Sequence, residues 1–162
     1  MRIGLWLAGV SLVFSTGCTQ DSGEISLFNG YNLDGWHLYN APQEEGIWVV
    51  RDGLLTCDPS VDATFGDLVT DKEFTNYEFS CSWRIDSGAN SGLFFQVLES
   101  DTIATPWMSG FEYQLLDNDD TLNHNHGDPT RMSGAFYGFY PLPDSVVYHP
   151  RGQWNSSRVI VN

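Results

Sequence analysis

Positive charge is scarce in this 162-residue sequence. Lys72 is the single lysine, and Lys and Arg together number 7 against 21 Asp and Glu, which gives a formal net charge of -14. A chain this acidic repels the phosphate backbone of nucleic acids and the headgroups of anionic membranes. Nucleic-acid binding and membrane attachment through basic patches are therefore excluded, whereas a neutral polar ligand or a cation held by carboxylates suits the composition.

Several motifs of catalytic chemistry are missing as well. The sequence has no Gly-x-Gly-x-x-Gly, no Gly-Lys-Ser/Thr, no Gly-x-Ser-x-Gly and no His-Glu-x-x-His. These patterns build dinucleotide sites, phosphate-binding loops, serine nucleophile elbows and zinc helices, respectively. We therefore expect no nucleotide cofactor and no serine-hydrolase chemistry.

Long hydrophobic runs are lacking too. The apolar run that begins at Ile3 and ends at Phe14 has about a dozen residues, whereas a bilayer span needs roughly 20. The positive start at Arg2 and the small residues before Cys18 are typical of a bacterial lipoprotein signal. A plain secretory signal and a buried first strand are the alternatives. The predicted organisation is a signal peptide over 1–17, lipidation at Cys18, a tether over 18–24 and one domain over 25–162. This predicts an exported protein that touches the membrane only through its N-terminal lipid anchor.

Cysteines are few, and two remain after the predicted signal. Cys57 and Cys81 can pair in an oxidising compartment, but spacing does not establish the geometry that a disulfide requires. Cys81 also occupies the apolar phase of a strand pattern, which favours a small core residue. No His lies close in sequence to either cysteine, so a catalytic thiol is disfavoured.

The body of the chain has the pattern of β-strands. Residues 77–86 alternate apolar and polar over ten positions, which is typical of a half-buried strand. Similar runs cover 93–98 and 111–116, and runs at 47–50 and 54–57 flank the turn residues Asp52 and Gly53. No sustained helical period is present outside the signal. The sequence predicts an all-β sandwich of two antiparallel sheets. The last strand pattern, over 158–162, stops without a turn, and we expect further C-terminal strands beyond it.

Polar residues with chemical potential cluster after the third of these runs. Carboxylates and imidazoles together suit a divalent metal, and a His beside an apolar pocket can act as a general base. A solvated loop whose Asp and Asn side chains make turns is the simpler alternative, and Glu112 can be a polar position on an exposed sheet face. The cluster comprises Glu112, Gln114, Asp117, Asn118, Asp119, Asp120, His124, Asn125, His126, Asp128 and Arg131.

Aromatic residues are abundant, at 14% of the chain. Aromatic faces pack on the C–H faces of sugars, yet in an all-β protein most of them fill the core. Arg84, one of few basic residues, ends the best strand pattern on its polar face. The candidates for a sugar platform are Trp107, Phe136, Tyr137, Phe139, Tyr140 and Trp154.

Seven short motifs in register resemble one family. They are Leu27-Phe28-Asn29-Gly30 with Leu33-Asp34-Gly35-Trp36, then 48–55 (WVVRDGLL), 90–95 (NSGLFF), 109–117 (SGFEYQLLD), 134–141 (GAFYGFYP), 152–155 (GQWN) and 158–161 (RVIV). In this order they resemble the 3-keto-disaccharide hydrolase family over roughly residues 25–162. The resemblance implies a concanavalin-like jelly roll and action on glycosides that are already oxidised at C3. It also implies cleavage by removal of the C2 proton, expulsion of the C1 aglycone and addition of water.

The resemblance also implies roles for residues. We expect Glu112 or His126 to remove the C2 proton, and Asp117 with His124 to bind one divalent metal ion if one is used. Asp117 is additionally a catalytic candidate. The predicted sugar-holding residues are Arg84, Gln114, Arg131, Tyr137 and Trp154. A lectin-like carbohydrate-binding module without catalysis is the alternative, since the same fold serves both functions.

Overall fold

The computed structural model describes residues 1–5, 10–13 and 23–162. Within these ranges the chain consists of strands, turns and two single-turn 3-10 helices, η1 and η2. The strands are β1 (Arg2–Leu5), β2 (Val10–Val13), β3 (Trp36–Leu38), β4 (Trp48–Arg51), β5 (Leu54–Cys57), β6 (Leu68–Thr70), β7 (Tyr77–Ile85), β8 (Asn90–Val97), β9 (Phe111–Leu116) and β10 (Asn155–Val161). The helices are η1 (Pro106–Met108) and η2 (Pro129–Arg131).

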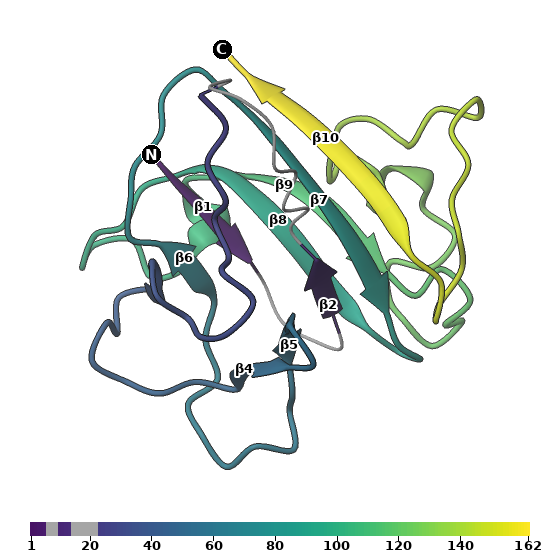
Figure 1. The fold of residues 1–162 in the computed structure, drawn as a ribbon. Coiled ribbons are helices and arrows are strands. Elements are labelled where there is room, and N and C mark those ends of the chain that lie inside the picture. The colour runs from purple at the N-terminus through teal and green to yellow at the C-terminus, as the bar shows by residue number, and fades with distance from the viewer. Residues whose placement is uncertain (6–9, 14–22) are drawn as a thin grey trace.

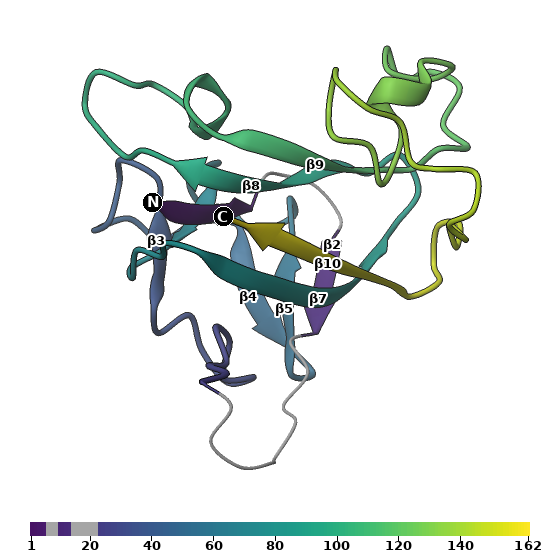
Figure 2. The same cartoon turned by 90° about the horizontal axis from the view of Figure 1, so that it is seen from above.

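The described strands form two five-stranded antiparallel sheets. The first sheet has the order β3-β6-β1-β8-β9 and the second the order β10-β7-β2-β5-β4 (Figure 1). Figure 2 shows the two layers edge-on, with β8 and β9 in one layer and β7 and β10 in the other. The predicted fold class, a sandwich of two antiparallel sheets, is confirmed.

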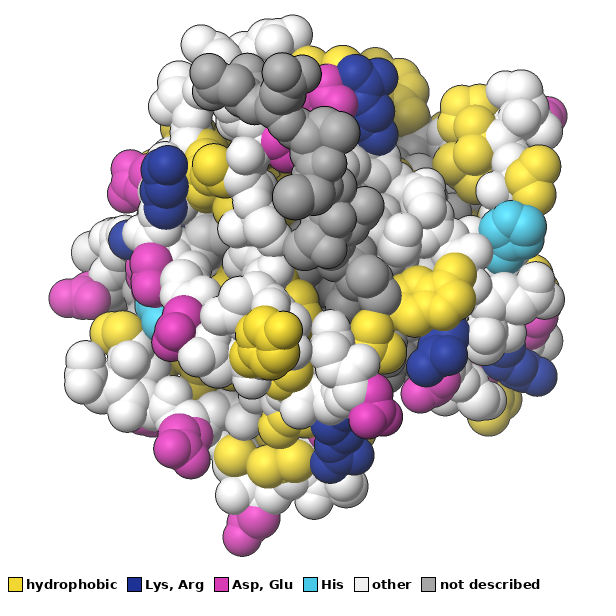
Figure 3. Space-filling model, viewed as in Figure 1, with side chains coloured by type: hydrophobic (Ala, Val, Ile, Leu, Met, Phe, Trp, Pro, Cys, Tyr) yellow, Lys and Arg dark blue, Asp and Glu magenta, His cyan; other side chains and the backbone are white. Residues whose placement is uncertain are grey.

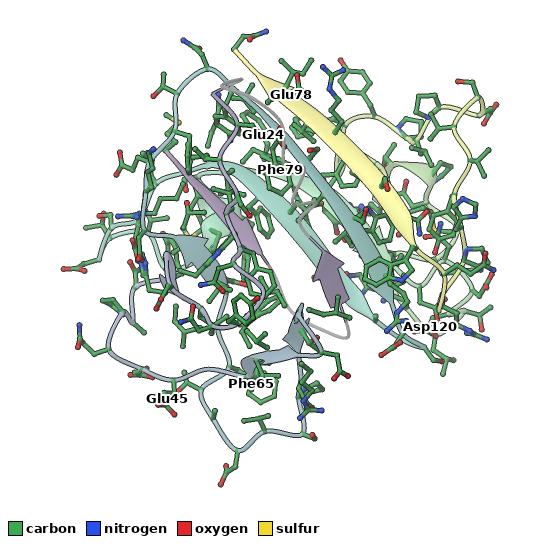
Figure 4. All side chains as sticks on the ribbon, viewed as in Figure 1. Glu24, Glu45, Phe65, Glu78, Phe79 and Asp120 are labelled. Carbon is green, nitrogen blue, oxygen red and sulfur yellow. The ribbon has the colours of Figure 1, made fainter. Side chains whose placement is uncertain are left out.

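The core lies between the sheets and follows from the alternation of the strands. In β7 the odd positions Phe79, Cys81 and Trp83 are buried, while the even positions are exposed or half-buried. Figure 4 shows Phe79 within the sandwich. The odd positions Leu93 and Phe95 of β8 complete this layer from the opposite sheet. Positions 90, 92 and 94 of β8 and 112 and 114 of β9 therefore face away from this core, and the alternation of β8 breaks at Gln96, whose φ is 60°.

The strand predictions agree with the structure where the alternation is long. Strand β9 has the predicted bounds, and β7 differs by one residue at its end. The β4–β5 hairpin turns through Asp52 and Gly53, whose φ angles of 51° and 76° suit the tight turn that the two residues predicted.

The N-terminal segment contributes an inner strand to each sheet. Strand β1 pairs with both β6 and β8, and β2 pairs with both β5 and β7. Cys18, the predicted lipidation site, lies outside the described residues, so the signal peptide stays a prediction. Within the described ranges, no helix has the length and hydrophobicity of a bilayer span.

The two remaining cysteines are buried thiols. Cys57 and Cys81 both lie in the core and form no disulfide. Burial raises the pKa of the Cys81 thiol to about 12, which makes the reactive thiolate scarce. Both cysteines therefore act as core side chains.

Basic side chains do not form a patch on the face shown in Figure 3. There they stand beside acidic side chains. Arg158 of β10 donates two hydrogen bonds to the Glu78 carboxylate of β7, from Nε at 2.5 Å and from Nη2 at 2.6 Å.

Candidate active site

Strand β9 carries the central acidic residue of the site. Glu112 lies opposite Phe94 of β8, and Gln114 lies opposite Gly92, all on the face that points away from the core. Gly92 has no side chain, and this makes room for the Glu112 carboxylate: a Cβ built on Gly92 would come within 3.0 Å of the Glu112 carboxyl carbon. The side chain of Glu112 therefore lies across β8 rather than projecting into solvent.

A cavity of about 420 Å³ opens over these two strands. One part of its wall is polar and the other is aromatic, which is the composition of a small-molecule site. The polar lining consists of Asn90, Glu112, Gln114, His124 and Asn125, and the remaining lining of Phe94, Trp107, Gly110, Phe111, Tyr137 and Phe139.

The environment of Glu112 makes it a weak acid. Burial raises the pKa of its carboxyl group to about 7, and the negative charge of Asp67 adds to the increase. A carboxyl group with this pKa is half ionised near neutral pH, where a general base is most effective. The alternative of a solvent-facing Glu112 on an exposed sheet face does not describe the structure, because Glu112 is half-buried in the wall of the cavity.

The loop after β9 is held against the strand by backbone hydrogen bonds. The Gly134 N–H donates to the Gln114 carbonyl at 2.9 Å, and the Tyr137 N–H donates to the Glu112 carbonyl at 3.0 Å. The Tyr137 hydroxyl donates to Asn125 Oδ1 at 3.1 Å within the cavity wall. Figure 2 shows these loops gathered at one end of β9. The loop thus carries polar side chains into the wall of the cavity that Glu112 lines.

Asp117 anchors this loop. Its buried carboxylate accepts hydrogen bonds from the Gly88 N–H at 2.9 Å, from Arg151 Nη1 at 3.1 Å and from the Asp119 N–H at 3.2 Å. Burial alone would raise the pKa of Asp117, but these three donors hold it below its usual value. Asp120, labelled in Figure 4, also lies beside the β7–β8 turn. Asp117 is not part of the cavity lining.

The two histidines of the cluster have different positions. Both are exposed, but His124 lines the cavity with Glu112, whereas His126 lies outside that lining with its Nδ1 3.2 Å from the Asn118 carbonyl oxygen. Among the described residues, no group of three or more His, Cys, Asp or Glu could hold a metal ion. Because three donors already occupy the Asp117 carboxylate, the residues here do not fit the predicted Asp117–His124 metal site, and no step below uses a metal.

The predicted sugar-holding residues fall into two groups. Gln114 and Tyr137 line the cavity, and Arg131 lies 5.5 Å from the centre of the Tyr137 ring. Arg84 and Trp154 pack on each other at 5.2 Å outside that lining. The structure therefore brings the first three together with Glu112 and keeps the other two apart from it.

Two polar residues near Glu112 were missed by the sequence analysis as individual candidates. Asn90 begins β8 and lines the cavity, and Asp67 precedes β6. Asn90 is the first residue of the NSGLFF motif, so this motif could have indicated Asn90 as a site candidate. Nothing in the local sequence marks Asp67, because its proximity to Glu112 results from the order of the strands in the first sheet.

Comparisons with known proteins bear on the family and the fold of this chain. A 3-keto-disaccharide hydrolase from Bacteroides thetaiotaomicron is 30% identical over 154 residues, covering 86% of this chain and 52% of the relative. A crystal structure described as a glycosyl hydrolase, from Parabacteroides distasonis, superposes with a TM-score of 0.71 at 30% identity, covering 84% of this chain and 62% of that one. This chain thus spans about half the length of the curated relative, and the likeness fits a jelly-roll sandwich. The profile of the 3-keto-alpha-glucoside-1,2-lyase-like domain matches residues 23–162, and the chain belongs to that family.

Proposed function

We propose that this protein cleaves 3-keto-glycosides, with Glu112 as the general base. The observation that carries the proposal is a single carboxyl group with a pKa near 7 in a half-aromatic cavity. Ordinary glycosidases place two carboxylates about the glycosidic bond and pass through an oxocarbenium-like transition state. A C3 ketone permits a different route, because it acidifies the hydrogen on C2.

The first step is an elimination. The Glu112 carboxylate takes the C2 proton, and the electron pair of that C–H bond forms an enolate with the C3 carbonyl. The enolate re-forms the ketone and a C1=C2 double bond as the C1–O bond breaks, and the aglycone oxygen takes a proton from an acid of the site. His124 and Tyr137 both line the cavity, and we assign this proton to the imidazole of His124.

The second step adds water to the 3-keto-glucal. His124, which has given its proton to the aglycone, takes a proton from a water molecule as the oxygen of that water bonds to C1. The carboxyl group of Glu112, whose acquired proton has exchanged with solvent while the aglycone leaves, then protonates C2 and becomes a carboxylate again. The product is a free 3-keto sugar, so base and acid end in their starting states. His126 lies outside the cavity lining, and we therefore assign the base to Glu112 rather than to His126.

The aromatic side of the cavity can bind the rest of the substrate, beyond the carbon atoms that react. Phe139 and Trp107 are 61% and 50% exposed at the cavity, where ring faces can pack on a sugar or an apolar aglycone. The same exposed rings favour the rival function, a carbohydrate-binding module. Loss of turnover on removing the Glu112 charge separates the two, because a binding module has no turnover to lose.

The test is aglycone release from a chromogenic 3-keto-glucoside. Glu112→Gln keeps the shape of the side chain and removes its basicity, so we expect kcat to fall by roughly 10²- to 10⁴-fold. Glu45→Gln is the matched control, since Glu45 is exposed and lies far from β9 (Figure 4). Equal turnover by the wild type and Glu112→Gln would remove Glu112 from the mechanism, and absence of turnover by the folded wild type would favour the binding module.

We also propose that the protein is exported and lipid-anchored at Cys18. The support is the sequence pattern of the first eighteen residues. Labelled palmitate incorporated by the wild type and lost in Cys18→Ala would support the anchor. Equal labelling of both would contradict it.

A further inference from the structure

Asp67 is a buried carboxyl group without a partner for one of its oxygens. It immediately precedes β6, is 8% exposed, and its Oδ1 accepts no hydrogen bond. Neither Asp67 nor Glu112 has an ion-pair partner among the described residues. An unpaired buried carboxylate opposes folding, so a purely structural account does not explain this residue.

Asp67 shares the outer face of the first sheet with Glu112. Side chains two residues apart on a strand point the same way, so Asp67 lies on the side of Val69. Val69 and Phe94 meet over Gly4, where a Cβ would lie 3.5 Å from Val69 Cγ1 and 3.4 Å from Phe94 Cβ. Phe94 is opposite Glu112. Asp67 and Glu112 therefore flank one apolar strip on the same face.

The charges around the strip are few. Besides Glu112, the cavity wall carries His124 and Tyr137 from the loop after β9, and Asp67 lies outside that wall on the β6 side. Burial raises the pKa of Asp67 to about 7, and Asp67 is the one group whose charge raises the pKa of Glu112.

We propose that Asp67 is a positioning residue that strengthens Glu112 as a base by like-charge repulsion across the outer face of the first sheet. This inference rests on the proposed function for its role in turnover, but the pairing itself does not depend on turnover. A stronger carboxylate base removes the C2 proton more readily, and Asp67 touches neither substrate nor reacting atoms.

The pairing is tested by titrating Glu112 directly. Carbon-13 NMR of protein with labelled Glu side chains, with Glu112→Gln assigning the signal, gives the midpoint in the wild type and in Asp67→Asn. We expect the midpoint to fall by roughly 0.5–1 pH unit in Asp67→Asn. Asp62→Asn, which removes an exposed charge nearby, should leave it unchanged. Asp67→Asn removes an unpaired buried charge and is expected to fold; Asp67→Ser gives a second neutral replacement.

The pH profile of kcat/KM gives the functional readout. The acidic limb should move to lower pH by the same amount, and the plateau should fall because a weaker base remains. An unshifted Glu112 midpoint in both folded Asp67 variants overturns the inference. A shifted midpoint in a protein whose wild type has no turnover upholds the pairing and overturns the proposed function instead.

Discussion

The position of the Glu112 carboxylate depends on the missing side chain of Gly92. A Cβ at residue 92 would lie 2.9 Å from Glu112 Cγ and 3.0 Å from its Cδ, closer than such contacts occur. The backbone of Gly92 needs no left-handed conformation, so the glycine is explained by this close approach rather than by φ. The base is thus placed by a residue that itself has no functional group.

Gly92→Ala should therefore impair catalysis more than folding. We expect kcat/KM to fall by about 10- to 100-fold, since a displacement of the base by about 1 Å can have an effect of that size. Gly66→Ala, whose Cβ would make ordinary contacts at 3.6 Å, is the control. Unchanged turnover by a folded Gly92→Ala would show that the Glu112 side chain does not need this space.

Asp117 lies in the same quoted motif as Glu112 but has a different environment. Its carboxylate binds the β7–β8 turn through the Gly88 N–H and the following loop through Arg151. Asp117→Ala leaves these donors without their acceptor, and we expect the free energy of unfolding to fall by about 2–3 kcal/mol. Denaturant unfolding measures this change. A variant of unchanged stability that has lost turnover would instead support the catalytic role that the sequence predicted for Asp117.

At the scale of elements, sequence alternation predicted the long strands and missed the short ones. Strands β7 and β9 alternate over enough residues for a period of two to be recognised, and the β4–β5 hairpin has its turn residues between two apolar runs. Strands β3 and β6 have three residues each, too few for a pattern. The partial burial of Glu112 could not be predicted either. It depends on the loop after β9, which folds back onto the strand through backbone hydrogen bonds that no local sequence pattern indicates.

The role of strands β1 and β2 can be tested at this scale. Each joins two neighbours within its sheet, so a chain that starts at Cys18 leaves four antiparallel pairings without a partner. Because we propose that the chain is cut before Cys18, we expect the shortened chain, expressed as 18–162, still to unfold cooperatively on heating. Loss of cooperative unfolding in 18–162 would show that β1 and β2 are required for the fold and would contradict the proposed cleavage.

At the scale of the whole molecule, the buried carboxyl groups link stability to pH. Asp67 and Glu112 have folded-state pKa values of about 7, above the value of roughly 4 in an unfolded chain. Between these values the folded state binds more protons than the unfolded state, so stability falls as pH rises from about 4 to about 7 and then levels off.

Thermal unfolding between pH 5 and pH 8 checks this linkage. We expect the Tm of the wild type to fall over this range more steeply than the Tm of the double variant Asp67→Asn/Glu112→Gln. The difference between the two proteins isolates the carboxyl groups from the histidines, which both proteins share. Parallel curves for the two would contradict the raised pKa values.

The central claim is that Glu112 removes the proton from C2. The most direct test is turnover of a 3-keto-glucoside in D2O, with the product examined by NMR and Glu112→Gln as the measure of background exchange. Elimination followed by hydration predicts deuterium at C2 of the released 3-keto sugar in the wild-type reaction, at a level above that background. Release of a 3-keto sugar that retains its original hydrogen at C2 would contradict the mechanism and point to direct displacement at C1.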